Sequence, residues 1–196
     1  MTLCKPSACR YGLPLLVLAG ILLSGAWLPA SADPVGPTPL DKQITKLVSY
    51  YIQEQHLSKH ELDDEISKRF LDMYLKTLDP MKVYFLQSDI DAFEKQRLLL
   101  DDQIQKGEIQ FAYDVFRVFL KRIDERVAWA EEAIEMKHDF TLDEQIIRDP
   151  DVAQYATNEA EARELWRKRI KFDLLRLRVD DEGLTEEKQK EKVRRR

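Results

Sequence analysis

The sequence predicts an all-α protein with about five amphipathic helices in an irregular bundle, preceded by a signal peptide and a proline-rich linker. Apolar residues recur every three to four positions through most of the chain, which is the period of an α-helix. No segment has the strict apolar–polar alternation of a half-buried β-strand. Glycine and proline almost vanish after Leu40, and the four that remain fall between the periodic segments: Pro80, Gly107, Pro150 and Gly183.

Composition limits the class of protein. The chain has 196 residues, of which 36 are acidic and 31 are Lys or Arg, so its formal net charge is −5. This acidic balance argues against a general nucleic-acid binder, which needs a basic surface, and nucleic acid is not expected as a partner. Cys4 and Cys9 both lie in the first ten residues, so no disulfide framework or cysteine metal cluster can hold the rest of the chain.

The first 32 residues are typical of a secretory signal peptide. Two basic residues precede an apolar run from Tyr11 to Leu28, and Ala30-Ser31-Ala32 matches a cleavage site. An uncleaved membrane anchor is the alternative, because 18 residues is near the lower limit for spanning a bilayer. Either way the protein is expected in the periplasm or cell envelope, with membrane contact only through an uncleaved leader. Residues 33–39, with three prolines, form the linker.

Two helices are expected directly after the linker. The first covers Asp41 to Gln55. The second starts at Ser58, where Glu61 completes a capping box, and ends before Asp79-Pro80 because a residue that precedes proline disfavours the helical region. Residues 83–86 form a short apolar connector. The expected core residues are Ile44, Leu47, Val48, Tyr51 and Ile52 in the first helix, and Leu62, Ile66, Phe70, Tyr74 (or Met73) and Leu78 in the second.

Three further helices are expected. The third runs from Ser88 to Gly107, and the fifth from Glu159 to Val179. The fourth is the longest, because seven apolar residues recur at helical spacing: Ala112, Phe116, Phe119, Ile123, Val127, Ala130 and Ile134. The fifth has its core face on Trp166, Ile170, Leu174 and Leu177. Residues 137–157 form a loop, and Glu186 to Arg196 is a charged helical segment without a completed apolar face.

The residues offer little catalytic chemistry. The segment after the leader lacks glycine-rich phosphate loops and a nucleophile elbow. No base or oxyanion hole can be identified around its four serines, which are Ser49, Ser58, Ser67 and Ser88. His56 and His60 have the spacing of zinc ligands, but Leu57 stands where a zinc protease has its glutamate, so both are expected to be surface histidines. We therefore expect no catalytic residue, no metal and no cofactor.

The fifth helix carries a basic side with two interpretations. One is the solvated outer side of an amphipathic core helix. The other is a docking surface for an acidic partner, which electrostatic complementarity would favour. The candidate docking residues are Arg163, Arg167, Lys168, Lys171, Arg176 and Arg178.

Residues 40–196 resemble the N-terminal domain of tail-specific proteases, also called carboxy-terminal processing proteases. Four stretches carry the resemblance: LDDEIS at 62–67, YLKTLDP at 74–80, YFLQSDI at 84–90 and WRKRIKFDLL at 166–175. The resemblance implies a secreted or periplasmic serine endopeptidase that recognises apolar C-terminal tails. It also implies that this helical domain precedes a PDZ domain and a protease core with a Ser–Lys dyad, in which lysine is the general base.

No position of this sequence matches the catalytic serine or lysine of that family, because the corresponding region would begin after Arg196. The end at Arg194-Arg195-Arg196 suggests a fragment, a truncated gene or a stand-alone relic. The first hypothesis is a non-catalytic domain that positions the PDZ and protease core of the same polypeptide and contacts substrates or an envelope adaptor. The alternative is a stand-alone exported helical binding module without protease function.

Overall fold

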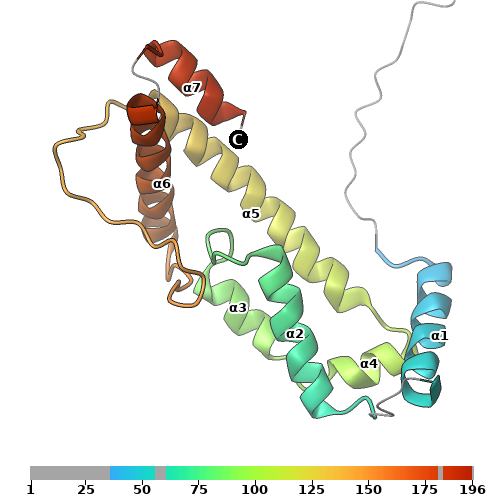
Figure 1. Cartoon of the computed structure of the whole chain (residues 1–196). Coiled ribbons are helices and arrows are strands. Elements are labelled where there is room, and N and C mark those ends of the chain that lie inside the picture. The colour runs from blue at the N-terminus through green and yellow to red at the C-terminus, as the bar shows by residue number, and fades with distance from the viewer. Residues whose placement is uncertain (1–35, 56–60, 181–182, 196) are drawn as a thin grey trace, which may run out of the picture. The chain divides into compact units, whose positions relative to one another are not determined.

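The computed structural model describes residues 36–55, 61–180 and 183–195, and these contain seven helices and no strand (Figure 1). The all-α prediction is confirmed. The predicted signal peptide, Cys4, Cys9, His56, Ser58 and His60 lie outside the described residues. The helices are α1 (Pro39–Gln55), α2 (Asp64–Leu78), α3 (Gln87–Glu94), α4 (Leu100–Lys106), α5 (Gln110–Glu135), α6 (Glu159–Asp180) and α7 (Glu186–Arg194).

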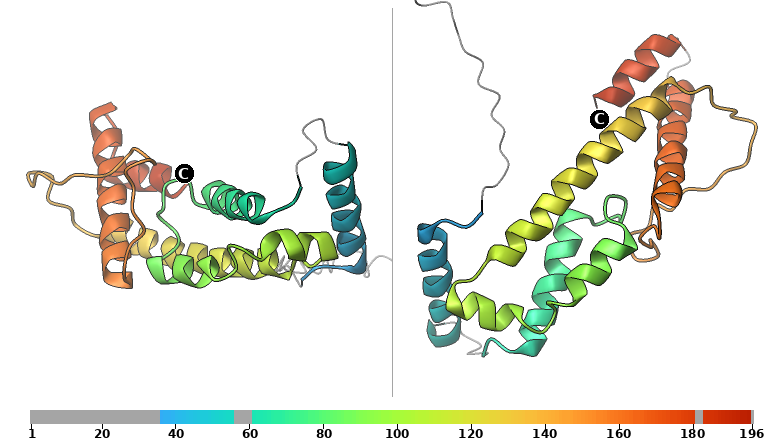
Figure 2. Two further views of the ribbon diagram at one scale, coloured as in Figure 1. Left: turned by 90° about the horizontal axis from the view of Figure 1, so that it is seen from below. Right: turned by 180° about the vertical axis from the view of Figure 1, so that it is seen from behind.

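The long helix α5 contributes to two apolar clusters. Near its N-terminal half, Val115 joins buried side chains from α2, α3, α4 and the connector that follows α2: Leu71, Leu75, Phe85, Ile90, Phe93 and Leu100. Near its C-terminal end, it packs with α6 and α7 through Ala133, Ile134, Ile170, Leu174, Leu177 and Val193. Both views of Figure 2 show α6 and α7 beside this end of α5, and α1 beside α4.

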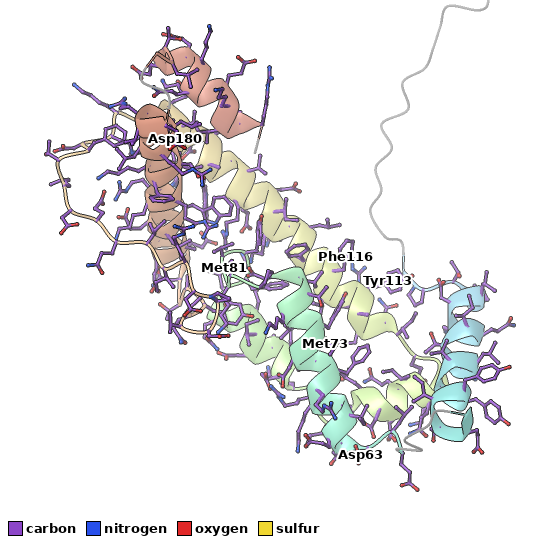
Figure 3. All side chains as sticks on the ribbon, viewed as in Figure 1. Asp63, Met73, Met81, Tyr113, Phe116 and Asp180 are labelled. Carbon is purple, nitrogen blue, oxygen red and sulfur yellow. The ribbon has the colours of Figure 1, made fainter. Side chains whose placement is uncertain are left out.

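Helix α2 begins later than predicted but ends at the predicted residue. Asp63 is its N-cap, and the Asp63 carboxylate accepts a hydrogen bond from the Ile66 amide at 2.9 Å. Figure 3 shows Asp63 at this end of α2. Glu61 therefore precedes the helix, and the capping box predicted at Ser58 and Glu61 is wrong. The Asp63 carboxylate instead accepts a hydrogen bond from a backbone amide of the first turn, which has no partner within the helix. At the other end, Asp79 is the C-cap, as Asp79-Pro80 predicts.

The helix predicted from Ser88 to Gly107 is two helices separated by a turn at residues 95–99. At this break the buried hydroxyl of Ser67, on α2, donates to the Arg97 carbonyl at 2.7 Å and accepts from the Leu100 amide at 3.0 Å. One side chain from a different helix thus satisfies two backbone groups that the broken helix leaves without helical partners. Gly107 ends α4 with a φ of +74°, as expected for a glycine C-cap.

The buried side of α5 is rotated relative to the predicted stripe. Arg122 and Arg126 are buried, whereas Val127, which the stripe includes, is about half exposed. The predicted stripe is confirmed at its C-terminal end, where Ile134 is buried. The cause lies in distant segments: α3 and the connector present acceptors for guanidinium groups, and this favours the arginine side over the wholly apolar one.

Two other predicted faces also differ. The five apolar residues of the first helix that were expected in the core are all exposed in α1, where the polar Ser49 is buried instead. In α2, Phe70, which was expected in the core, is exposed, and Leu71 and Leu75 are buried instead. At the C-terminal end, α7 buries its single apolar residue, Val193, against α5 and α6, so it forms no wider apolar face. The predicted face of α6 is confirmed, with Ile170, Leu174 and Leu177 buried.

Candidate docking surface

The connector between α2 and α3 is held in one conformation by a single carboxylate. Asp79 is 1% exposed, and its oxygens accept hydrogen bonds from the backbone amides of Val83, Tyr84 and Phe85 at 2.8, 2.9 and 3.0 Å. Three hydrogen bonds from amide groups offset the free-energy cost of burying the carboxylate. Lys82 takes a positive φ of 54° in this turn. Asp79-Pro80 and Tyr84-Phe85, which belong to the stretches that resemble the family, therefore form a turn that the Asp79 carboxylate fixes.

Two arginines of α5 attach the connector and α3 to that helix. Arg122 donates twice to Asp89, with Nε and Nη2 each 2.9 Å from a carboxylate oxygen. Arg126, whose side chain is fully buried, donates from Nη2 to the Tyr84 carbonyl at 2.7 Å and lies 4.2 Å from the ring of Trp129. Burial lowers the pKa of Arg126. These contacts fix the connector against α5.

Helix α6 is attached to the same connector. The indole Nε1 of Trp166 donates to the Val83 carbonyl at 2.9 Å, and the rings of Tyr84 and Trp166 lie 5.7 Å apart. The adjoining loop is attached too, since the Gln87 amide donates to the Ala156 carbonyl at 2.8 Å. α5, α6 and the loop before α6 therefore all meet at residues 83–87.

A cleft of about 230 Å³ opens between the connector, this loop and α6. Its apolar wall comes from three segments: Met81, Val83, Ile146, Ile147, Ala153 and Leu165. Figure 3 shows Met81 in the turn between α2 and α3. Glu161, Glu164, Lys168 and Arg169 stand around the cleft. An apolar wall with convergent charged groups is the usual composition of a peptide or ligand site.

Four of the six candidate docking residues already have acidic partners in the chain. Arg163 pairs with Glu132 of α5, and Lys168 lies 3.9 Å from Glu164. Arg167 and the buried Lys171 both bind Glu144, a residue of the loop before α6. Arg178 lies 4.4 Å from the ring of Phe140 and is exposed, as is Arg176. The basic side of α6 thus holds its own loop, and docking of an acidic partner to these six residues stays a prediction.

Glu144 is the electrostatic centre of that contact. Hydrogen bonds from Arg167 and then Lys171 lower its pKa to about 2. The carboxylate therefore stays charged under ordinary conditions and keeps the loop on α6. Helix α6 accordingly uses part of its basic side for packing. The sequence alone could not show this, because Glu144 lies in a segment without a periodic pattern.

The remaining candidates of the sequence have structural environments. The Ser67 hydroxyl is engaged with Arg97 and Leu100, and Ser49 is buried in α1. His138 contacts the Ala133 carbonyl at 2.7 Å. Within the part of the chain that the structure describes, no group of three His, Cys, Asp or Glu residues could hold a metal ion. Over the same residues, no helix has the length and apolarity that a membrane span needs.

Sequence reasoning missed Asp79, Asp89, Arg122 and Arg126 as a group. A signal exists for the arginines: Phe119, Arg122, Arg126, Trp129 and Ala133 follow steps of three and four residues, as the apolar stripe beside them does. Two arginines in such a row indicate buried ion pairs when acidic partners are available. Glu125 of the same helix pairs with both arginines, but Asp89 and the Tyr84 carbonyl lie 33 and 42 residues away in the chain, so the sequence pattern alone does not identify these two partners.

Comparison with known proteins shows what the chain is similar to. A family described as the tail specific protease N-terminal domain matches residues 48–196. The chain is also 35% identical, over 147 residues, to a tail-specific protease of Haemophilus influenzae. That alignment covers 74% of this chain and 21% of the Haemophilus protein, so the chain spans about a fifth of the length of this relative.

Proposed function

Because the chain belongs to the tail-specific protease family, whose N-terminal domain it carries, we propose that it is the non-catalytic helical domain of an exported tail-specific serine endopeptidase. In this function it supports the PDZ domain and the protease core of the same polypeptide. The observation that carries the proposal is the match over residues 48–196, which includes all of α2 to α7.

The contacts around the connector support a framework role. Asp79, Arg126 and Trp166 bind neighbouring backbone groups of residues 83–85, and they come from α2's C-cap, α5 and α6. A site that several elements fix in this way resists local opening. Such a framework suits a domain that must hold attached domains at a constant distance.

The cleft beside α6 supports a second part of the proposal, which is contact with protein substrates or an envelope adaptor. Its apolar wall matches the apolar tails that the family resemblance implies as substrates, and Arg169 offers positive charge for a terminal carboxylate. Ile147 is the one exposed residue of this wall, with 54% of its surface accessible.

The framework role is tested by complementation. The Haemophilus protease is prepared without the region that matches this chain, and cleavage of a model substrate with an apolar C-terminal tail is measured with and without this chain, in trans and as a fusion. We expect cleavage to rise when the chain is present. Unchanged cleavage in both formats, with the chain folded by circular dichroism, would contradict the proposal.

The docking role has its own test. Ile147→Asp places a charge in the cleft, while Val152→Asp changes a similarly exposed apolar residue of the same loop that does not line the cleft. Binding of an apolar-tailed peptide, followed by fluorescence anisotropy, should weaken at least tenfold with the first variant only. Equal binding by both variants would assign recognition to another surface.

The alternative function is an exported binding module that docks an acidic partner on α6. Arg176 and Arg178 favour it, because both remain exposed while their neighbours are paired. The DNA after codon 196 distinguishes the two: an open frame that encodes a PDZ domain and a Ser–Lys core supports the protease, and a stop followed by unrelated sequence supports the module. Export itself is proposed from the leader, and fractionation of cells into periplasm and cytoplasm tests it.

A further inference from the structure

The loop between α5 and α6 supplies part of the wall of the cleft beside α6. Gln145, Ile146 and Ile147 form one part of this wall, and Ala153 and Gln154 form another. Both views of Figure 2 show the loop as an arc beside α6. We call residues 143–152 of this loop the strap. The rest of the wall comes from α6 and from the turn between α2 and α3.

The cleft is small for the ligand that the proposed function assigns to it. Its volume is about 230 Å³, whereas ligand pockets usually have roughly 300–1,000 Å³. An apolar peptide tail of several residues therefore enters only if one wall of the cleft moves away from the others.

The strap is the least constrained of these walls. The turn between α2 and α3 is fixed by the contacts described above, and α6 is held by its buried apolar side. Within the described residues, no backbone–backbone hydrogen bond joins residues 143–147 to another segment. Ile147 and Val152 are exposed, and the contact of Arg148 with the ring of Phe172, at 5.6 Å, is of a kind that is weak outside the core. A segment with so few buried contacts opens at a low cost in free energy.

One ionic contact fastens the strap to α6. The Glu144 carboxylate accepts hydrogen bonds from Arg167 and Lys171, and the side chains of Glu144 and Lys171 are 20% and 7% exposed. Ile146 lines both the cleft and a smaller hollow of about 70 Å³, which Glu144 and Lys171 line as well. Release of Glu144 therefore frees the part of the cleft wall that contains Ile146.

The other end of the strap is attached through its backbone. The Ala153 carbonyl accepts a hydrogen bond from Lys82 Nζ, and the Ala156 carbonyl accepts one from the Gln87 amide, both at 2.8 Å. These bonds do not involve a side chain of the strap, and they remain when Glu144 leaves α6. The strap can therefore swing about this end while its other end opens.

We propose that the strap covers the cleft and that the ion pairs of Glu144 with Arg167 and Lys171 are its latch. When the latch is closed, the strap narrows the cleft, and when the latch is released, residues 143–147 move off α6 and an apolar peptide can enter. The inference rests on the proposed docking function for its ligand, but the movement follows from the loop itself. Because a ligand that binds only the open form pays for the rarity of that form, the latch sets the apparent affinity.

The reactivity of a thiol in the inner wall measures the movement without any ligand. In the full chain with Cys4 and Cys9 replaced by serine, Ile146→Cys places a thiol at a half-buried position, and Ile147→Cys places one at an exposed position as the control. Glu144→Ala should raise the rate of modification by a soluble disulfide reagent at least fivefold at position 146. The rate at position 147 should stay within twofold.

Two further variants check that the latch is the cause. Asp143→Asn removes a neighbouring negative charge that is exposed and has no ion pair within the described residues, and it should leave the rate at position 146 unchanged. Lys171→Met keeps most of the buried side chain and should raise this rate less than Glu144→Ala, because Arg167 still binds Glu144. An unchanged rate at position 146 in Glu144→Ala, or in Lys171→Met if the first variant does not fold, overturns the proposal.

Peptide binding separates this inference from the proposed function. With the apolar-tailed peptide used above, Glu144→Ala should raise the association rate constant at least threefold, and Asp143→Asn should not. If the thiol at position 146 becomes reactive but no protein binds the peptide, the strap moves as proposed and the docking function is wrong. If all proteins bind the peptide at the same rate, the docking function stands and the strap does not control the cleft.

Discussion

The hydroxyl of Ser67 accepts a hydrogen bond from the backbone amide of Leu100 at 3.0 Å, and so caps α4 from a different helix. The same hydroxyl donates to the Arg97 carbonyl on the other side of the turn between α3 and α4. Both contacts are buried or partly buried, so water cannot readily replace them. Ser67 thus adds a hydrogen-bonded contact to the packing of α4 on α2, and α1 in turn packs on α4.

Ser67→Ala should destabilise the protein by about 1–3 kcal/mol, because the Leu100 amide is left buried without a partner. Urea unfolding followed by circular dichroism measures the change. Thr77→Ala is the matched control: its hydroxyl bonds within α2, to the Met73 carbonyl, at an exposed position, and its effect should stay within roughly 0.5 kcal/mol. Equal effects of both variants would contradict the capping role.

Arg126→Ala should cost about 3 kcal/mol, because it leaves the Tyr84 carbonyl without its donor and opens a cavity beside Trp129. Arg126→Met keeps most of the volume and should cost less. The control is Arg117→Ala, since Arg117 is half exposed and pairs with Asp114 in the same helix. Thermal or urea denaturation compares the three variants, and an Arg126→Ala protein as stable as the control would show that the buried guanidinium is dispensable.

The loop before α6 should loosen in acid. Arg167 and Lys171 lower the pKa of Glu144 to about 2 from an ordinary value of 4.5, so the folded state favours the charged carboxylate. Its stabilising contribution is complete above about pH 4.5 and is lost as the pH falls toward 2. The midpoint of urea unfolding, measured from pH 7 to pH 2, should therefore fall less in Glu144→Gln than in the unaltered chain. If the midpoint of urea unfolding fell by the same amount with pH in both proteins, Glu144 would not contribute to the loss of stability in acid.

Gly107→Ala should displace α1 from α4, with a loss of about 1–2 kcal/mol, because the residue combines a φ of +74° with the close approach of the Lys42 carbonyl. Gly107→Asn separates the two causes: asparagine tolerates a positive φ but also carries a Cβ atom. Amide hydrogen exchange in α1 should rise in both variants. If only Gly107→Ala exposes α1, backbone strain is responsible and the close contact is not.

The predicted and observed folds differ where contacts between distant segments decide. The helical period correctly indicated α5 and α6, and Asp79-Pro80 and Gly107 correctly marked helix ends. The break between α3 and α4 was missed because it depends on Ser67, which lies about 30 residues earlier. Lys171, a candidate docking residue, is buried and forms an ion pair with Glu144. The sequence did not predict this pair, because Glu144 lies in a segment without a periodic pattern.

The sequence by itself determined the all-α class, most helix boundaries and the resemblance to the tail-specific protease N-terminal domain, because period, proline, glycine and short motifs are local properties of the chain. Only the tertiary structure decided which side of each helix is buried. In α5 the acceptors of Asp89 and Tyr84 select the arginine side, and in α1 the contacts of Ser49, Asp41 and Gly107 turn the apolar side outward. The physical reason is that an amphipathic pattern defines two sides of a helix, while the partners that cover one of them come from elsewhere in the chain.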